Sequence, residues 1–150
     1  MTTVVLDTSV ILAFYLPAEP LKENALRLLA EYAAGRLRFA TPTLTRYEIL
    51  NVLARCTRGL KPGQAMRLDQ AMAVQSAIAR LSIEEHPVAP LAEDVLRIAT
   101  QHARSAYDAA YVALAAHLEV PLITADERLA NALRGSAPDV RFLGALGVGA

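Results

Sequence analysis

The chain has 150 residues, of which 54% are hydrophobic, so it is long enough to bury a core and too apolar for a disordered protein. Its 15 basic and 15 acidic side chains cancel, which argues against a uniformly positive surface for bulk nucleic-acid binding. No apolar run reaches the roughly 18 residues of a membrane span, and the N-terminus lacks the pattern of a signal peptide. We therefore expect a soluble, cytoplasmic protein with one domain over residues 1–150.

The first element is an unbroken apolar run, Val4 to Leu6, that ends at Asp7. Such a run is typical of a strand buried on both faces inside a parallel sheet. Asp7 then lies where the strand ends and a turn into a helix begins. Ligands of open α/β sheets bind beyond the carboxyl ends of the strands, so Asp7 is either a helix N-cap or a metal ligand or nucleophile.

Helices and strands then alternate along the chain. Apolar periodicity, prolines and glycines predict helices over residues 21–34, 42–57, 64–80, 91–101, 106–118 and 127–133, and strands near 37–40, 81–86, 120–123 and 140–143. The helices within 42–80 should form a hairpin, with the single cysteine, Cys56, packed as a small apolar residue. The tail from Gly144 should be loose. This alternation predicts a three-layer α/β/α sandwich with a central parallel sheet.

Four acids occupy comparable positions in this pattern. Asp7 and Asp126 follow predicted strands, Asp108 opens a predicted helix, and Glu48 lies beside the apolar stripe of another. Because strand ends and the following helix starts share one rim of a parallel sheet, three of these acids could converge there. Clustered carboxylates repel each other unless a cation or protons intervene, and oxygen ligands alone suit Mg²⁺ or Mn²⁺ better than zinc.

Each acid also has a purely structural interpretation. Three pairs have the spacing of a helix capping box: Ser105 with Asp108, Thr45 with Glu48, and Thr124 with Glu127. Any one acid alone is more simply a cap, whereas four acids together on one rim favour a metal site. The histidines lack metal-ligand spacing and are expected at the surface or at helix ends: His86, His102 and His117.

The ordered set of motifs resembles that of PIN-domain proteins, and among them the VapC-type toxins of toxin–antitoxin pairs. The matching residues are Val5-Leu6-Asp7-Thr8-Ser9, Glu48, Tyr107-Asp108-Ala109-Ala110-Tyr111-Val112-Ala113-Leu114-Ala115 and Leu122-Ile123-Thr124-Ala125-Asp126. The resemblance spans nearly the whole chain and implies a Mg²⁺-dependent endoribonuclease, usually a homodimer, that a small antitoxin holds inactive. Many relatives carry a further acid and an aromatic after the last motif, whereas this chain reads Glu127-Arg128-Leu129.

The resemblance also implies roles for individual residues. A divalent ion would offset the charge of the phosphodiester and lower the pKa of a bound water. Its ligands would be Asp7, Asp108 and Asp126, with Glu48 a direct or water-mediated ligand. Three hydroxyls would orient ligands or water: Thr8, Ser9 and Thr124. Four basic residues could guide RNA, although a solvated helix face is the simpler interpretation: Arg46, Arg55, Arg58 and Lys61.

Two other functions remain open. One is an aspartyl-phosphate phosphotransferase with Asp7 as the nucleophile. Such enzymes usually carry a second Asp two residues later, where this chain has Ser9. The other is a non-catalytic module whose acidic rim binds metal or RNA. The intact set of four acids argues against this module, because mutually repelling acids are costly to hold together without a cation.

Overall fold

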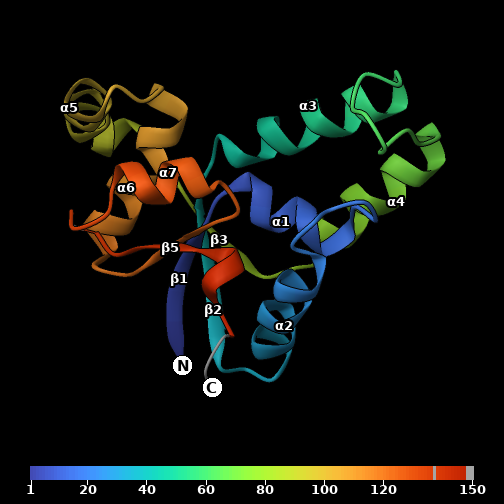
Figure 1. The fold of residues 1–150 in the computed structure, drawn as a ribbon, viewed down its shortest axis with the longest axis horizontal. Helices are drawn as coiled ribbons and strands as arrows, with labels where there is room; N and C mark the ends of the chain where they lie inside the picture. The colour runs from blue at the N-terminus through green and yellow to red at the C-terminus, as the bar shows by residue number, and fades with distance from the viewer. Residues whose placement is uncertain (137, 148–150) are drawn as a thin grey trace.

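The computed structural model describes residues 1–136 and 138–147. Helices and strands alternate along the chain (Figure 1). Their bounds are β1 Thr2–Leu6, α1 Thr8–Tyr15, α2 Lys22–Ala33, β2 Leu37–Pro42, α3 Thr45–Thr57, α4 Leu68–Ala79, β3 Ile83–His86, the 3₁₀ turn η1 Ala89–Leu91, α5 Ala92–His102, α6 Ala106–Leu118, β4 Leu122–Thr124, α7 Glu127–Ala132, β5 Val140–Phe142 and the 3₁₀ turn η2 Leu143–Ala145.

The strands form one sheet in the order β3-β2-β1-β4-β5, and every pairing is parallel. The chain builds outward from β1 through β2 to β3, then returns across the sheet to add β4 and β5 on the other side of β1. The strand order therefore reverses between β1 and β4. In open α/β sheets, such a switch point opens a crevice at the carboxyl ends of the two strands.

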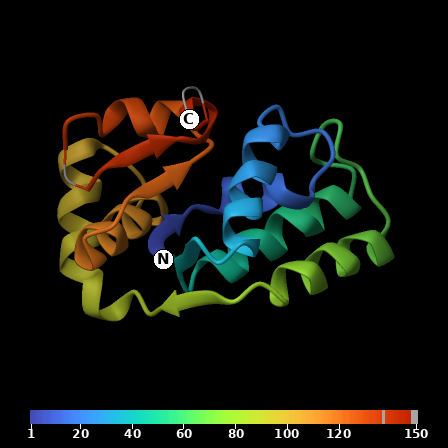
Figure 2. The same ribbon diagram turned by 90° about the horizontal axis from the view of Figure 1, so that it is seen from below.

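Helices cover both faces of the sheet, and each face has its own hydrophobic cluster (Figures 1 and 2). Val4 packs into the cluster formed with α1 to α4, whereas Val5 packs into the cluster formed with α5, α6 and α7. Consecutive residues of a strand point to opposite faces, so an all-apolar strand supplies both clusters. This arrangement confirms the predicted three-layer sandwich with a central parallel sheet. The assignment of residues 1–150 to a single domain stays a prediction.

Two predicted helix starts are wrong. Pro42 ends β2, where it pairs with His86 of β3, and α3 begins three residues later at Thr45. Proline is tolerated at a strand end, where its missing N–H removes no essential ladder bond. The fourth helix begins at Leu68 rather than near Gln64, because residues before it are tied to distant parts of the chain: Gln64 accepts the Ala18 N–H, the Met66 N–H donates to the Cys56 carbonyl, and Arg67 is an extended N-cap.

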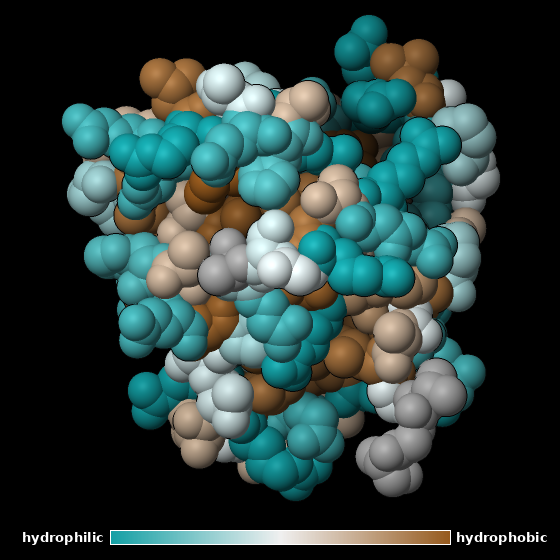
Figure 3. Space-filling view, turned by 60° about the vertical axis from the view of Figure 1, so that its left-hand side comes forward, coloured by the Kyte–Doolittle hydropathy of each residue, from teal (hydrophilic) through white to brown (hydrophobic). Residues whose placement is uncertain are grey.

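The remaining expectations for the fold hold in part. Cys56 is fully buried in α3, as predicted. The tail is not loose at its start, because η2 contains Gly144 and buries Leu143, and residues 148–150 lie outside the described residues. Among the residues that the structure describes, no helix is both long and apolar enough to span a membrane. On the face shown in Figure 3, hydrophobic side chains show between many hydrophilic ones.

Candidate metal centre at the carboxyl ends of β1 and β4

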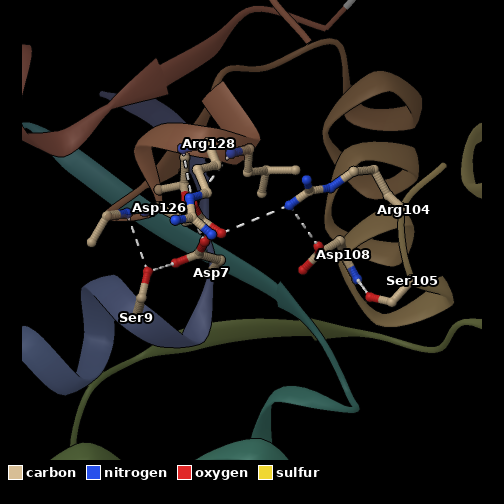
Figure 4. A network of polar contacts seen from close by, with 10 residues as sticks. Asp7, Ser9, Arg104, Ser105, Asp108, Asp126 and Arg128 are labelled. Atoms are coloured by element: carbon tan, nitrogen blue, oxygen red, sulfur yellow. Dashed lines mark hydrogen bonds and ion pairs between the residues drawn. The ribbon is translucent and has the colours of Figure 1, made fainter. Parts of the chain in front are cut away.

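Two acids flank the switch point of the sheet. β1 and β4 pair through Leu6 and Ile123, and each strand is followed by an acid that begins the next helix. Asp7 is the N-cap of α1 and Asp126 is the N-cap of α7 (Figure 4). The rim of the sheet at its switch point, where α/β proteins commonly bind ligands, therefore carries two carboxylates.

Asp7 is buried and is held by hydroxyl groups on both of its oxygens. Its side chain is 8% exposed. Oδ1 accepts hydrogen bonds from the Ser9 hydroxyl and from the Val10 N–H at 3.3 Å, and Oδ2 accepts one from the Thr124 hydroxyl. The pKa of Asp7 is raised from 3.8 to about 6, chiefly by burial and to a lesser extent by the charge of Asp108, while these hydrogen bonds act to lower it.

Asp126 divides its two oxygens between a helix cap and the rim. Oδ1 accepts the N–H groups of Arg128 at 3.0 Å and Leu129 at 3.3 Å. Oδ2 lies 3.7 Å from the Arg104 guanidinium. The same guanidinium nitrogen donates to Asp108 Oδ2 at 3.1 Å, so Arg104 links two acids that come from different elements (Figure 4). Being a cap does not exclude Asp126 from the site, because one of its oxygens stays free of the helix.

Glu48 is positioned by a buried tyrosine. The Tyr111 hydroxyl, from α6, hydrogen-bonds Glu48 Oε1, and it also lies 2.7 Å from the Thr8 hydroxyl and 2.8 Å from the Thr45 hydroxyl. Thr8 in turn donates to Glu48 Oε1 at 3.0 Å. This network joins α1, α3 and α6, and it fixes Glu48 close to the residue that follows Asp7. Burial, followed by the hydrogen bond to Glu48, raises the pKa of Tyr111, which keeps its hydroxyl protonated as a donor.

Two of the three alternative capping pairs are wrong and one is half formed. α3 has Leu44 at its N-cap with no side-chain cap, and Thr45 and Glu48 instead contact Tyr111. α7 is capped by Asp126, while Thr124 turns its hydroxyl to Asp7. Ser105 does cap α6, accepting the Asp108 N–H at 3.1 Å, but the Asp108 carboxylate contacts Arg104. The carboxylates of Glu48 and Asp108 thus contact side chains of other elements at the rim, whereas Asp7 and Asp126 also cap their own helices.

The donor chemistry of the rim fits a hard divalent ion, but the acids do not enclose one as they stand. Within residues 1–136 and 138–147, no three acidic, histidine or cysteine side chains are grouped closely enough to hold a metal ion. Arg104 lies between Asp108 and Asp126. Carboxylate oxygens without thiolate or imidazole suit Mg²⁺ or Mn²⁺. Binding an ion between these two acids requires the guanidinium to move.

The histidines and basic residues that the sequence singled out lie in different surroundings. His102 ends α5 and His117 lies in the last turn of α6, as predicted, whereas His86 is a strand residue whose side chain is 23% exposed. Arg46 pairs with Glu85 at 2.5 Å, which favours its interpretation as part of a solvated face. Lys61 instead lines a hollow of about 340 Å³ with Thr8, Ser9 and Glu48.

The sequence pattern does not reveal the roles of two residues of this network, Arg104 and Tyr111. Arg104 precedes Asp108 by four residues, a spacing typical of ion pairs, yet it lies before α6 and its second partner is distant in sequence. Tyr111 was recognised only as part of a motif. Its position one turn after Asp108 was a signal that it shares the same helix face.

We predict that Tyr111→Phe reduces the RNA cleavage that the family resemblance implies by about 10-fold to 100-fold, because a group that orients Glu48 is lost. It should also lower stability by about 1–3 kcal/mol, since the buried hydroxyls of Thr8 and Thr45 lose a partner. Rates on RNA and urea unfolding measure the two effects. Tyr107→Phe, on the same helix but 65% exposed, is the control. Equal activity of Tyr111→Phe and wild type would contradict the positioning role.

The fold and the rim together define a parallel α/β protein with acidic side chains at its switch point, and the comparisons with known proteins give the family. The model of the PIN domain matches residues 4–134. The chain therefore belongs to the PIN-domain family, and the predicted family resemblance is confirmed.

Relatives support the same grouping. The chain is 34% identical over 130 residues to "Ribonuclease VapC3" of Pyrobaculum aerophilum, covering 85% of this chain and 92% of that protein. It also resembles the solved structure of VapBC2 from Rickettsia felis bound to a promoter DNA fragment, with a TM-score of 0.62 and 13% identity over 94% of this chain and 98% of that chain. A second similar structure is VapBC-5 from Mycobacterium tuberculosis, with a TM-score of 0.57 and 24% identity over 95% of this chain and 98% of that chain. At these identities, the two structures establish the fold alone.

Proposed function

We propose that the protein is a metal-dependent endoribonuclease that cleaves RNA by a metal-activated water, and that it is the toxin of a type II toxin–antitoxin system. The observation that carries the proposal is the arrangement of Asp7, Asp108 and Asp126 at the switch point of the sheet. The name of the 34% identical relative, a ribonuclease, supports the activity. Solved structures of VapBC toxin–antitoxin systems with the same fold support the biological role.

In this proposal, Asp7, Asp108 and Asp126 hold Mg²⁺ or Mn²⁺, and Glu48 is a direct or water-mediated ligand. The bound ion supplies charge neutralisation at the phosphodiester and a water of lowered pKa. Ser9 and Thr124 fix the orientation of the Asp7 carboxylate by donating to its two oxygens. Thr8 and Tyr111 do the same for Glu48. Lys61, beside Glu48 in the hollow, is placed to meet an RNA phosphate.

The test is cleavage of total RNA from host cells with Mg²⁺, with Mn²⁺ and with excess EDTA. We expect cleavage only with a divalent ion, because carboxylates at the rim need a bound metal ion to activate a water. The product ends should carry a 5′-phosphate and a 3′-hydroxyl. Mapping these ends also identifies the RNA and the bond that is cut. Full activity in excess chelator would exclude the metal mechanism.

The geometry also bears on the two rival functions. Asp7 is a poor candidate for a phosphorylated nucleophile, since both of its oxygens accept hydrogen bonds and its side chain is buried. Incubation with a small phosphodonor, followed by mass measurement, checks for a phosphorylated protein. A non-catalytic module would bind metal and RNA without cutting the RNA. Titration of a divalent ion with and without RNA, alongside the cleavage assay, distinguishes this outcome.

We also propose a homodimer and a small antitoxin partner. The apolar face of α2 is not a candidate interface, because it buries Ala25 and Leu28 in the core. The α3–α4 hairpin instead exposes large apolar side chains and is the candidate: Tyr47, Leu50, Leu68 and Met72. Exposed apolar side chains of this size on one hairpin favour self-association. Co-purification with the product of a neighbouring small reading frame would identify the antitoxin.

Light scattering at tens of micromolar should therefore give twice the chain mass of 16.1 kDa. Met72→Glu should shift this mass toward the monomer, because it replaces an exposed apolar side chain of the hairpin with a charge. Arg97→Glu, on the exposed surface of α5, should leave the dimer intact. A monomer mass for the wild type under these conditions would remove the homodimer.

A further inference from the structure

Arg104 extends into the acidic rim from the connection between α5 and α6 (Figure 4). Its backbone is anchored: Ala103 has a left-handed φ of 51°, and the Arg104 N–H donates to the Ala99 carbonyl at 3.1 Å. This is the Schellman pattern, which reverses the chain direction at the end of a helix. The fold thus holds Arg104 at the start of α6, one turn before Asp108.

The side chain of Arg104 is held by charge and is only partly satisfied by hydrogen bonds. Its terminal nitrogen lies 3.1 Å from Asp108 Oδ2 and 3.7 Å from Asp126 Oδ2. The side chain is 22% exposed. Its Nε is buried and makes no hydrogen bond to any residue that the structure describes. A guanidinium in this position offsets the repulsion between the two acids, but the site does not satisfy all of its N–H donors.

The carboxylates of Asp108 and Asp126 are also the ones that the proposed function assigns to a divalent ion. A guanidinium has five N–H donors and no lone pair to offer a metal, so it cannot become a ligand. Its positive charge also repels a cation a few ångströms away. Arg104 and a metal ion therefore cannot share the space between Asp108 and Asp126.

We propose that Arg104 is a tethered cation that competes with the divalent ion for Asp108 and Asp126, and so sets the metal concentration at which the site is filled. This inference rests on the proposed function, because it requires that these acids bind metal. In the metal-free protein, Arg104 offsets the charge of the two acids. Metal binding displaces the guanidinium, and the cost of that displacement lowers the affinity for the ion.

The test is calorimetric titration of Mn²⁺ alone into wild type and Arg104→Gln, a change that removes the charge and keeps a polar side chain. We expect the variant to bind at least tenfold more tightly, which corresponds to about 1.4 kcal/mol. Arg104→Lys keeps the charge and should stay close to wild type. Arg97→Gln is the matched control, because Arg97 pairs with Asp94 at 2.6 Å on the exposed surface of α5.

Thermal melts in EDTA establish that each variant is folded. A second measurement uses the wild type alone: the Nε–Hε NMR signal of Arg104 should shift on saturation with Mg²⁺. An NMR signal that does not shift overturns the competition. Equal or weaker Mn²⁺ binding by Arg104→Gln also overturns it, because removal of an arginine that only organises the acids would weaken metal binding. Absence of metal binding in wild type and variants, with cleavage unaffected by chelator, overturns the proposed function and the competition together.

Discussion

Asp7→Asn is expected to reduce RNA cleavage by at least about a hundredfold, because a central carboxylate of the proposed metal site is lost. The same variant should change the dependence of stability on pH. The pKa of Asp7 is raised from 3.8 to about 6, chiefly by burial. Between these two values, the folded protein binds a proton that the unfolded chain has released. Folding is therefore favoured at the acidic end of this range and opposed above it.

The expected size of this effect follows from the two pKa values. At about 1.4 kcal/mol per pH unit, the wild type in EDTA should lose about 3 kcal/mol through Asp7 as pH rises from about 4 to above 6. Asp7→Asn has no such charge and should lack this loss. Urea unfolding of both proteins in EDTA from pH 4 to 8 gives the difference curve.

A matched substitution separates this effect from a general loss of negative charge. Asp139 is 60% exposed and pairs with Arg141 at 2.7 Å, so Asp139→Asn should follow the wild-type curve. If the stability of the wild type and of Asp7→Asn changed with pH in the same way, burial would not raise the pKa of Asp7 in the folded protein. Full cleavage activity in Asp7→Asn would remove Asp7 from the site.

Asp108→Asn is expected to abolish cleavage and to remove most of the stabilisation that the protein gains from Mg²⁺. A ligand that binds only the folded state stabilises it by about 2.7 kcal/mol at one hundred times its Kd. In EDTA the variant should differ from wild type by no more than about 1 kcal/mol, because the Asp108–Arg104 pair is partly exposed and Arg104 keeps Asp126 as a partner. Thermal melts with EDTA and with millimolar Mg²⁺ measure both effects.

Asp94→Asn is the control for this substitution. Asp94 also lies in the first turn of a helix and pairs with an arginine, Arg97, but it is remote from the rim. It should respond to Mg²⁺ as the wild type does. If Asp108→Asn melts clearly lower in EDTA and neither it nor the wild type responds to Mg²⁺, Asp108 is a structural residue and the proposed site is wrong.

The sequence by itself determined the layers of the fold and the residue types of the site. The apolar run before Asp7 and the alternation of helix and strand patterns predicted a parallel sheet between helices, and the bounds of α6, Ala106–Leu118, were correct. These features follow from local periodicity, which depends on residues only a few positions apart. The apolar stripes and the motifs containing Asp108 and Asp126 are signals of this local kind.

Only the tertiary structure decided which acids cap helices, which face the rim and what lies between them. Thr124 resembles a capping residue in the sequence, but its hydroxyl contacts Asp7, 117 positions away. Tyr111 orients Glu48 across 63 positions in the sequence. Arg104, which precedes α6, lies close to Asp126, which follows β4. A polar side chain near a helix start can satisfy its own backbone or a distant partner at similar cost. The choice depends on which elements the folded sheet brings together, and local spacing carries no information about that.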